Sequence, residues 1–227
     1  MNERIEKLRT QSLEAEPRIS IERARLLTEF YRTGEAEQAS VPVARALAFA
    51  YLLKNKEICV NEGELVVGER GPAPKATPTY PEICTHTSRD LDILSTREKI
   101  SFDVDGQTRR VQEEEIIPFW SGRSIRDRIF QEVGEEWRRA YEAGVFTEFQ
   151  EQRAPGHTVL DGKIYSKGFA DFKMEIGKSI ERLDLEGDPA AVGKREELEA
   201  MSIAADALIA FAGRHAERLR ALAAGEG

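Results

Sequence analysis

The sequence predicts a mainly α-helical protein with a few short β-strands. Apolar residues recur at steps of three and four over most of the chain, capping residues precede several of these stripes, and β-branched runs are short. The chain has 227 residues, a length typical of one large domain or of one and a half small ones.

Three helices are expected in the first 54 residues. One covers residues 3–15 and ends before Pro17, and a second starts after Ser20 as its cap and ends near Gly34. The third, from Val43 to Lys54, is apolar nearly all round. A helix of that kind has to be covered on most sides.

Short elements and irregular segments alternate in the middle of the chain. Residues 64–68 (ELVVG) predict a strand or an extended segment, and the proline-rich residues 70–82 predict an irregular connection. A helix capped by Ser88 is expected over residues 88–96, and Asp105-Gly106 signals a tight turn after residues 100–104. Several separate helical segments are expected over residues 111–144, with an interruption at Pro118.

The C-terminal third predicts a hairpin followed by two helices. Residues 158–165 favour two strands around Asp161-Gly162, and the first helix runs from Gly168 to about Leu183. The last helix begins at Asp188-Pro189 and carries an apolar stripe over residues 198–222. A stripe of this length implies a binding partner or further polypeptide that covers it.

Charge and composition exclude several classes of function. Lys and Arg number 33 and Asp and Glu 41, which leaves a net charge of −8 and disfavours nucleic-acid and anionic membrane partners. The longest apolar run, residues 46–53, is too short to cross a bilayer, and no signal peptide is apparent, so we expect a cytoplasmic protein. Cys59 and Cys84 are the only cysteines and form no CxxC pair, so neither a disulfide framework nor a metal site is expected.

The three histidines differ in the roles that their positions allow. His215 lies on the apolar stripe of the last helix, which favours a packed core histidine, and His86 lacks further ligands at metal spacing. His157 follows a Pro-Gly turn, where an imidazole can exchange a proton near neutral pH or can simply stabilise the turn. Phe149, eight residues earlier, is by default a core residue.

Several stretches of the chain together carry a family pattern. They are AEPRISIERA (15–24), NEGELVVGE (61–69), PTYPEIC (78–84), EEIIPFW (114–120), FTEFQEQRAPGHTV (146–159) and IYSKGF (164–169) with Asp171. In this order they resemble the N-terminal region of glycyl radical enzymes of the pyruvate formate-lyase superfamily. Within that family, the dehydratase and eliminase branch is the most similar, and the hydroxyproline dehydratases above all.

The resemblance implies that residues 1–227 are the N-terminal portion of a ten-stranded α/β barrel that shields a radical. It implies radical elimination of water from a small hydroxylated substrate, such as trans-4-hydroxy-L-proline. The implied partners are this substrate, a radical SAM activase that installs a glycyl radical, and a second copy in a homodimer. By the same resemblance, Phe149 binds the substrate, and His157 is a catalytic residue near the proton-transfer groups.

The chain departs from the family in the residues that carry the radical. The family's active cysteine lies in a glycine-cysteine motif with a nearby glutamate, and its radical glycine in an arginine-valine-x-glycine-tyrosine motif. Neither motif occurs in these 227 residues. We therefore expect no C-terminal glycine radical domain, no cofactor and no turnover from this chain alone. The alternative is a non-catalytic helical interaction module derived from such an enzyme.

Overall fold

The computed structural model describes residues 2–145 and 160–225, and this part of the chain is mainly helical, as predicted. The chain divides into two units. Unit 1 comprises residues 1–8, 26–72 and 158–227, and unit 2 comprises residues 9–25 and 73–157. Two helices, α1 (Glu3–Glu14) and α2 (Glu22–Arg32), begin in one unit and end in the other.

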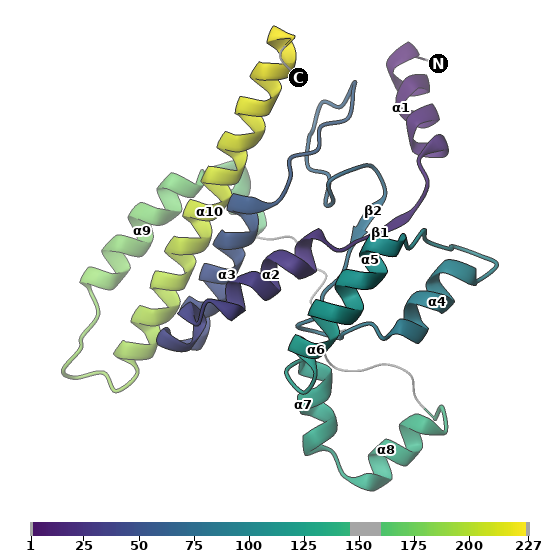
Figure 1. Ribbon diagram of the computed structural model, residues 1–227. Helices are drawn as coiled ribbons and strands as arrows, with labels where there is room; N and C mark the ends of the chain where they lie inside the picture. The colour runs from purple at the N-terminus through teal and green to yellow at the C-terminus, as the bar shows by residue number, and fades with distance from the viewer. Residues whose placement is uncertain (1, 146–159, 226–227) are drawn as a thin grey trace. The chain divides into compact units, whose positions relative to one another are not determined.

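Unit 1 is a group of helices around the last helix of the chain. Its elements are η1 (Glu35–Gln38), α3 (Val41–Asn55), η4 (Asp161–Tyr165), α9 (Phe169–Glu181) and α10 (Ala191–Ala224). Helix α10 packs along both α3 and α9, and Figure 1 shows the three side by side. Four of the five buried residues of α3 are alanines, which allow a close approach of neighbouring helices. The prediction that α3 needs cover on several sides agrees with this burial.

In its described residues, unit 2 combines the short strands with several short helical segments. They are β1 (Arg18–Ser20), β2 (Ala76–Pro78), α4 (Ser88–Thr96), α5 (Gly106–Val111), the π-helical η2 (Gln112–Ile116), α6 (Ile117–Trp120), α7 (Ile125–Glu132) and α8 (Glu135–Glu142). Strands β1 and β2 are parallel, with Ile19 opposite Thr77. Thus the expected few short strands form one two-stranded sheet in the described part of the chain.

Two regions do not form the strands predicted for them, although for residues 64–68 an extended segment was the other prediction. Residues 64–68 form no strand, and Leu65 and Val66 are 79% and 89% exposed, because β-branched residues make a strand only where a partner satisfies their backbone. In the predicted hairpin, residues 158–159 lie outside the described residues, and Asp161–Tyr165 is a 3₁₀-helix. Asp161 and Gly162 do form a turn, but it is the first turn of this 3₁₀-helix, in which the Lys163 amide donates to the Leu160 carbonyl at 3.2 Å.

Several helix boundaries differ from the predicted ones by a few residues. Ser20 is not a cap, because it belongs to β1 and α2 begins at Glu22. The cap of α4 is Thr87, which forms a capping box with Asp90, and helix α10 begins at Ala191 rather than at Asp188. Asp105 does not make a tight turn: its carboxylate caps α5 by accepting from the Thr108 amide at 2.6 Å.

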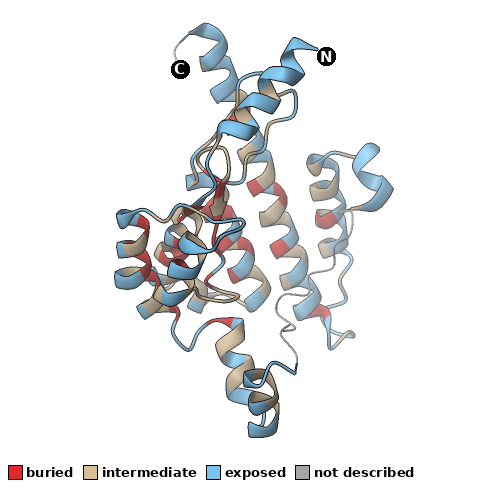
Figure 2. Ribbon diagram, turned by 90° about the vertical axis from the view of Figure 1, so that its right-hand side faces the viewer, coloured by how far each residue is buried: buried red, intermediate tan, exposed pale blue. Residues whose placement is uncertain are grey.

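The burial pattern leaves much of the helical surface open. Buried residues occupy narrow bands along the helices in Figure 2, and α1, α7 and α8 have none. Large apolar side chains are exposed on α10, among them Val192, Met201 and Leu219. None of the helices described is both long and apolar enough to cross a bilayer.

Candidate functional site

The two residues predicted to touch the substrate, Phe149 and His157, lie outside the described residues. Their roles therefore stay predictions. What the structure describes is the part of unit 2 that leads to them along the chain, namely α7, α8 and the residues up to Val145.

Helices α7 and α8 are joined by a cluster of aromatic rings. The ring of Phe130 lies edge-on to Trp137 at 5.7 Å and to Tyr141 at 5.5 Å between centroids, and Trp137 stacks on Tyr141 at 6.0 Å. Edge-to-face and stacked pairs of this kind are favourable beyond the area that they bury. Because neither helix has a fully buried residue, these rings carry much of the attachment between α7 and α8.

Arg126, in the first turn of α7, extends this cluster to a second part of unit 2. Its Nη1 donates to Cys84 Sγ at 3.1 Å, and its Nη2 donates to the Tyr141 hydroxyl. The guanidinium carbon lies 5.9 Å from the Phe130 ring centroid and 5.6 Å from that of Tyr141. A planar guanidinium can serve two acceptors in different directions and stack on a ring at the same time.

Residues 79–84, which we call the Cys84 platform, are held from the other side by Arg23. The Arg23 guanidinium donates to both carboxylate oxygens of Glu82 and to the Thr79 carbonyl, and it lies 4.0 Å above the ring of Tyr80. The side chains of Arg23 and Glu82 are only 23% and 26% exposed. Bidentate pairs with little solvent access have fixed geometry, so this segment is firmly placed despite its lack of regular structure.

The backbone of the Cys84 platform also receives the start of α7. The amide of Ile125 donates to the Glu82 carbonyl at 2.9 Å, and the amide of Arg126 donates to the Ile83 carbonyl at 3.1 Å. Ser124, which is buried, caps the helix by accepting from the Asp127 amide at 3.0 Å. Two amides that helix geometry leaves without an intrahelical partner are thus satisfied by the platform.

His86 follows the Cys84 platform and is anchored through its backbone. Its carbonyl accepts from Nε2 of Gln112 at 2.8 Å, and Gln112 is buried in the π-helical turn η2. Burial lowers the pKa of the His86 imidazole, so the ring is neutral at pH 7. No group of three or more potential metal ligands occurs in the part of the chain that the structure describes.

The two thiols have different surroundings. Burial, followed by the nearby carboxylates of Glu69, Glu64 and Glu57, raises the pKa of the Cys59 thiol, which is therefore protonated at neutral pH. Cys84 Sγ accepts the hydrogen bond from Arg126. Neither cysteine follows a glycine as the radical cysteine of the family does.

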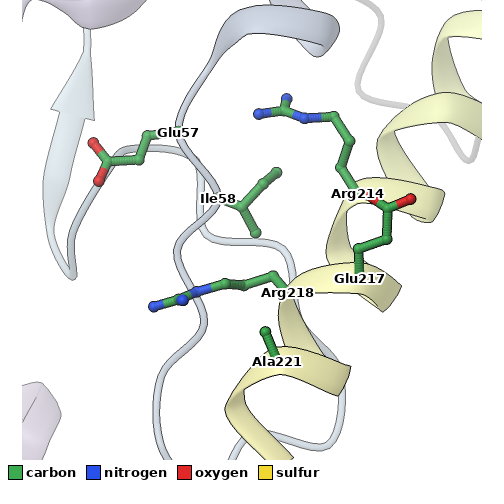
Figure 3. Close-up of a pocket in the computed structure, with 6 residues that line it drawn as sticks. All are labelled: Glu57, Ile58, Arg214, Glu217, Arg218 and Ala221. Atoms are coloured by element: carbon green, nitrogen blue, oxygen red, sulfur yellow. The ribbon is translucent and has the colours of Figure 1, made fainter. Parts of the chain in front are cut away.

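Unit 1 contains a separate cavity of about 630 Å³ beside the C-terminal half of α10 (Figure 3). Arg214 caps the C-terminal end of α3 there, with donations to the Leu53 carbonyl at 2.6 Å and the Lys56 carbonyl at 2.7 Å. Two glutamates and two arginines line this cavity, so it has no excess of either charge: Glu57, Ile58, Arg214, Glu217, Arg218 and Ala221. The polar groups of this cavity therefore serve to join α10 to the C-terminal end of α3.

His215 has the packed role that its position in the sequence predicts. It is 7% exposed, its ring lies edge-on to Phe211 at 4.4 Å, and Nδ1 donates to the Phe211 carbonyl at 3.0 Å.

The sequence reasoning missed Arg23 and Arg126, because an arginine in an amphipathic helix resembles any solvated charge. The only available signal was their spacing from the PTYPEIC stretch, which by itself says nothing about contact.

Comparison with known proteins finds relatives over the whole chain. A family model described as pyruvate formate lyase-like matches residues 1–227. Trans-4-hydroxy-L-proline dehydratase of Clostridioides difficile is 49% identical over 221 residues, which are 97% of this chain and 28% of that protein.

Solved structures agree with the sequence comparison. The crystal structure of hydroxyproline dehydratase from Clostridioides difficile, with trans-4-hydroxy-L-proline bound, matches 100% of this chain and 29% of that one, with a TM-score of 0.92 and 48% identity. A glycyl radical enzyme from Archaeoglobus fulgidus matches 99% of this chain and 29% of that one, with a TM-score of 0.87 and 28% identity. The chain spans less than a third of the length of these relatives.

Proposed function

Since this chain belongs to the pyruvate formate lyase-like family, we propose that it is the N-terminal part of a glycyl radical dehydratase that acts on trans-4-hydroxy-L-proline. The resemblance predicted from the sequence is confirmed at the level of the family. The observation that carries the proposal is the 49% identity with a hydroxyproline dehydratase over 97% of the chain, at a matching fold. Identity with the other glycyl radical enzyme is much lower, at 28%.

The glycyl radical, installed by a radical SAM activase, supplies hydrogen abstraction through a cysteine thiyl in this family. The residues described here do not fit that role. Cys59 has a raised pKa among carboxylates, Cys84 is engaged by Arg126, and the motifs of the radical cysteine and glycine do not occur in these 227 residues. The proposal therefore assigns the radical groups to other polypeptide of the enzyme.

The role proposed for this chain is to enclose the substrate and to assist proton transfer. Excluding water and stray hydrogen donors is necessary for a reactive intermediate to survive. We assign to Phe149 the packing against the substrate ring. We assign to His157 proton transfer during loss of the hydroxyl group as water, because an imidazole titrates near neutral pH.

The test is an anaerobic assay of the full-length enzyme with activase, S-adenosylmethionine and trans-4-hydroxy-L-proline. We expect a pyrroline carboxylate and one water per substrate consumed, and no product from residues 1–227 alone. Glycerol serves as the competing substrate. A glycyl radical signal without hydroxyproline turnover, or turnover of glycerol alone, would reject the assignment of the substrate.

The role of His157 is tested in the same assay with His157→Gln. We expect a lower turnover number with an unchanged unfolding midpoint, because glutamine keeps the size and hydrogen bonding of the side chain but cannot be protonated near neutral pH. Unchanged kinetics would return His157 to the role of a turn residue.

A further inference from the structure

We propose that Asp161-Gly162 is a site of spontaneous covalent modification, at which aspartate converts to isoaspartate, and that Asp105-Gly106 resists the same reaction. These are the two Asp-Gly dipeptides of the sequence, and both carry the same turn signal. The tertiary structure gives them different surroundings. The inference concerns the chain itself and does not depend on the substrate of the enzyme.

The reaction needs an aspartate whose carboxyl carbon can meet the amide nitrogen of the next residue. The glycine nitrogen attacks Cγ of the aspartate, a C–N bond forms, the Cγ–OH bond breaks, and the hydroxyl leaves with the amide proton as water. Water then opens the five-membered succinimide. Opening at the main-chain carbonyl leaves the chain linked through Cγ, which is isoaspartate, and opening at Cγ restores aspartate. Glycine favours the attack because it has no Cβ to hinder the approach.

The two glycine amides are similarly placed. Gly106 is the first residue of α5, and Gly162 is the second residue of η4. Neither amide has an acceptor within its own helix, because the first amides of a helix precede its first intrahelical hydrogen bond. Both glycines are exposed. A difference in reactivity therefore comes from the two carboxyl groups and from the freedom of the two backbones.

The carboxylate of Asp105 is held in an unreactive state. Its Oδ1 accepts from the Thr108 amide at 2.6 Å, and this hydrogen bond lowers the pKa of the carboxyl below its ordinary value. The protonated form, which can lose its hydroxyl as water, is therefore rarer at Asp105 near neutral pH than at an ordinary carboxyl. Two buried side chains, Thr108 and Val111, also hold α5 in place.

The carboxylate of Asp161 is open. Among the described residues, no hydrogen bond or ion pair reaches it, and every residue of η4 is exposed. Leu160 and Asp161 have φ angles of 67° and 52°, in the left-handed region that residues with a Cβ rarely adopt. A strained first turn without a buried anchor opens more readily than a capped helix, and opening lets Cγ approach the Gly162 amide.

Conversion to isoaspartate changes the local structure of η4. The modified residue carries the chain through Cγ and so adds a methylene group to the backbone. The hydrogen bond from the Lys163 amide to the Leu160 carbonyl spans Asp161 and Gly162, and the ring that it closes becomes larger. We therefore expect the modification to open the first turn of η4.

The experiment incubates the full-length enzyme at neutral pH and follows isoaspartate at both positions by peptide mapping. An endoproteinase that cleaves before aspartate but not before isoaspartate distinguishes the two forms, which have equal mass. We expect isoaspartate to form at residue 161 at least about fivefold faster than at residue 105, since Asp105 must first give up a capping hydrogen bond. Equal rates, or a faster rate at Asp105, would overturn the proposal. So would an Asp161 that stays intact in the native enzyme but reacts in urea.

Two alanine variants provide matched controls. Gly162→Ala should remove most of the isoaspartate at residue 161, whereas Gly106→Ala should leave it unchanged. Neither glycine has a positive φ, and a Cβ added at either one meets no atom within 4 Å outside its immediate neighbours in the chain, so both variants should fold. Undiminished isoaspartate at residue 161 in Gly162→Ala would contradict attack by this amide.

A second pair of variants tests the geometry without the carboxyl charge. Asp161→Asn and Asp105→Asn form the same succinimide with loss of ammonia, and the deamidation is visible as a change in mass. Because a side-chain amide is uncharged near neutral pH, their rates report the freedom of the side chain and of the backbone. Asp161→Asn should deamidate faster, and equal rates in the native enzyme would reject the structural difference between the two sites.

Discussion

Single polar side chains decide where several helices of this chain begin. Thr87, Asp105 and Ser124 each accept a hydrogen bond from a backbone amide three residues later. The first amides of a helix have no intrahelical acceptor, so one side chain oxygen in the right place is worth about 1 kcal/mol. Short helices such as α5 depend on free energies of this size, because they have few turns and bury few side chains.

Asp105→Ala tests this dependence. The hydrogen bond from the Thr108 backbone amide lowers the pKa of the Asp105 carboxyl below its ordinary value, and this effect exceeds the opposing effect of burial. A lowered folded-state pKa means that the stabilisation is present above the unfolded pKa of about 3.9 and is lost as the pH falls through the folded value. In urea unfolding at pH 7, we expect Asp105→Ala to lose about 1 kcal/mol.

The control for this prediction is Gln107→Ala, a change at an exposed neighbouring position. It should leave the free energy of unfolding nearly unchanged. As the pH falls below the unfolded pKa of about 3.9 towards pH 2, the difference between Asp105→Ala and the wild type should shrink, because the carboxyl takes up a proton. A constant difference between pH 7 and pH 2 would show that Asp105 acts by some means other than its charge.

At the scale of elements, the packing of α3 and α10 depends on small side chains. Ala44, Ala46, Ala48 and Ala50 are buried on α3, and Ala207 is 1% exposed on α10. Helices that meet through alanine approach closely, and added methylene groups have no room without displacement of the backbone or of a neighbour.

Ala207→Leu should therefore destabilise the protein by about 1–3 kcal/mol, although leucine and alanine both favour helix. Ala210→Leu, three residues later on an exposed position of α10, is the matched control and should change stability by only a few tenths of a kcal/mol. The measurement is the midpoint of chemical unfolding at constant slope. Equal midpoints for the two variants would contradict close packing at Ala207.

The segment around Pro118 shows how an element can differ from its sequence pattern. Proline has no amide hydrogen and predicts an interruption in the helix. The structure instead passes through a π-helical turn, in which the Ile117 amide donates to the Gln112 carbonyl five residues earlier, and Pro118 then occupies the start of α6. The wider π-helical turn accommodates the absence of an amide hydrogen at Pro118, so the helix continues into α6.

For the whole molecule, the exposed apolar side chains are the most informative feature. Val192, Met201 and Leu219 on α10 are 62%, 54% and 40% exposed, and Val66 is 89% exposed. Exposed apolar surface of this kind commonly marks an interface. The relatives are more than three times as long as this chain, and we expect their additional polypeptide to have a counterpart that covers these side chains.

Residues 1–227 in isolation should therefore bind a hydrophobic dye and associate at micromolar concentration. The double variant Met201→Gln, Leu219→Gln should bind less dye, and Glu197→Gln, which leaves the apolar surface unchanged, should behave as the wild type. A monomer that melts cooperatively without dye binding would favour the alternative of a self-sufficient interaction module.

The sequence by itself determined the helical class, the family and most helices to within three residues. Periodic apolar positions, capping residues and prolines act over a few residues along the chain, so their effects can be read locally. The pocket roles of Phe149 and His157 came from the resemblance of residues 146–159 to the family and not from local patterns, and they stay predictions.

Only the tertiary structure decided the roles of the Cys84 platform, Arg23 and Arg126. These contacts join residues between 15 and 59 positions apart, and no periodicity along the chain encodes which charge meets which acceptor. Strand formation failed at residues 64–68 for the same physical reason: a strand needs a partner, and the partner is chosen by the fold and not by the strand's own residues.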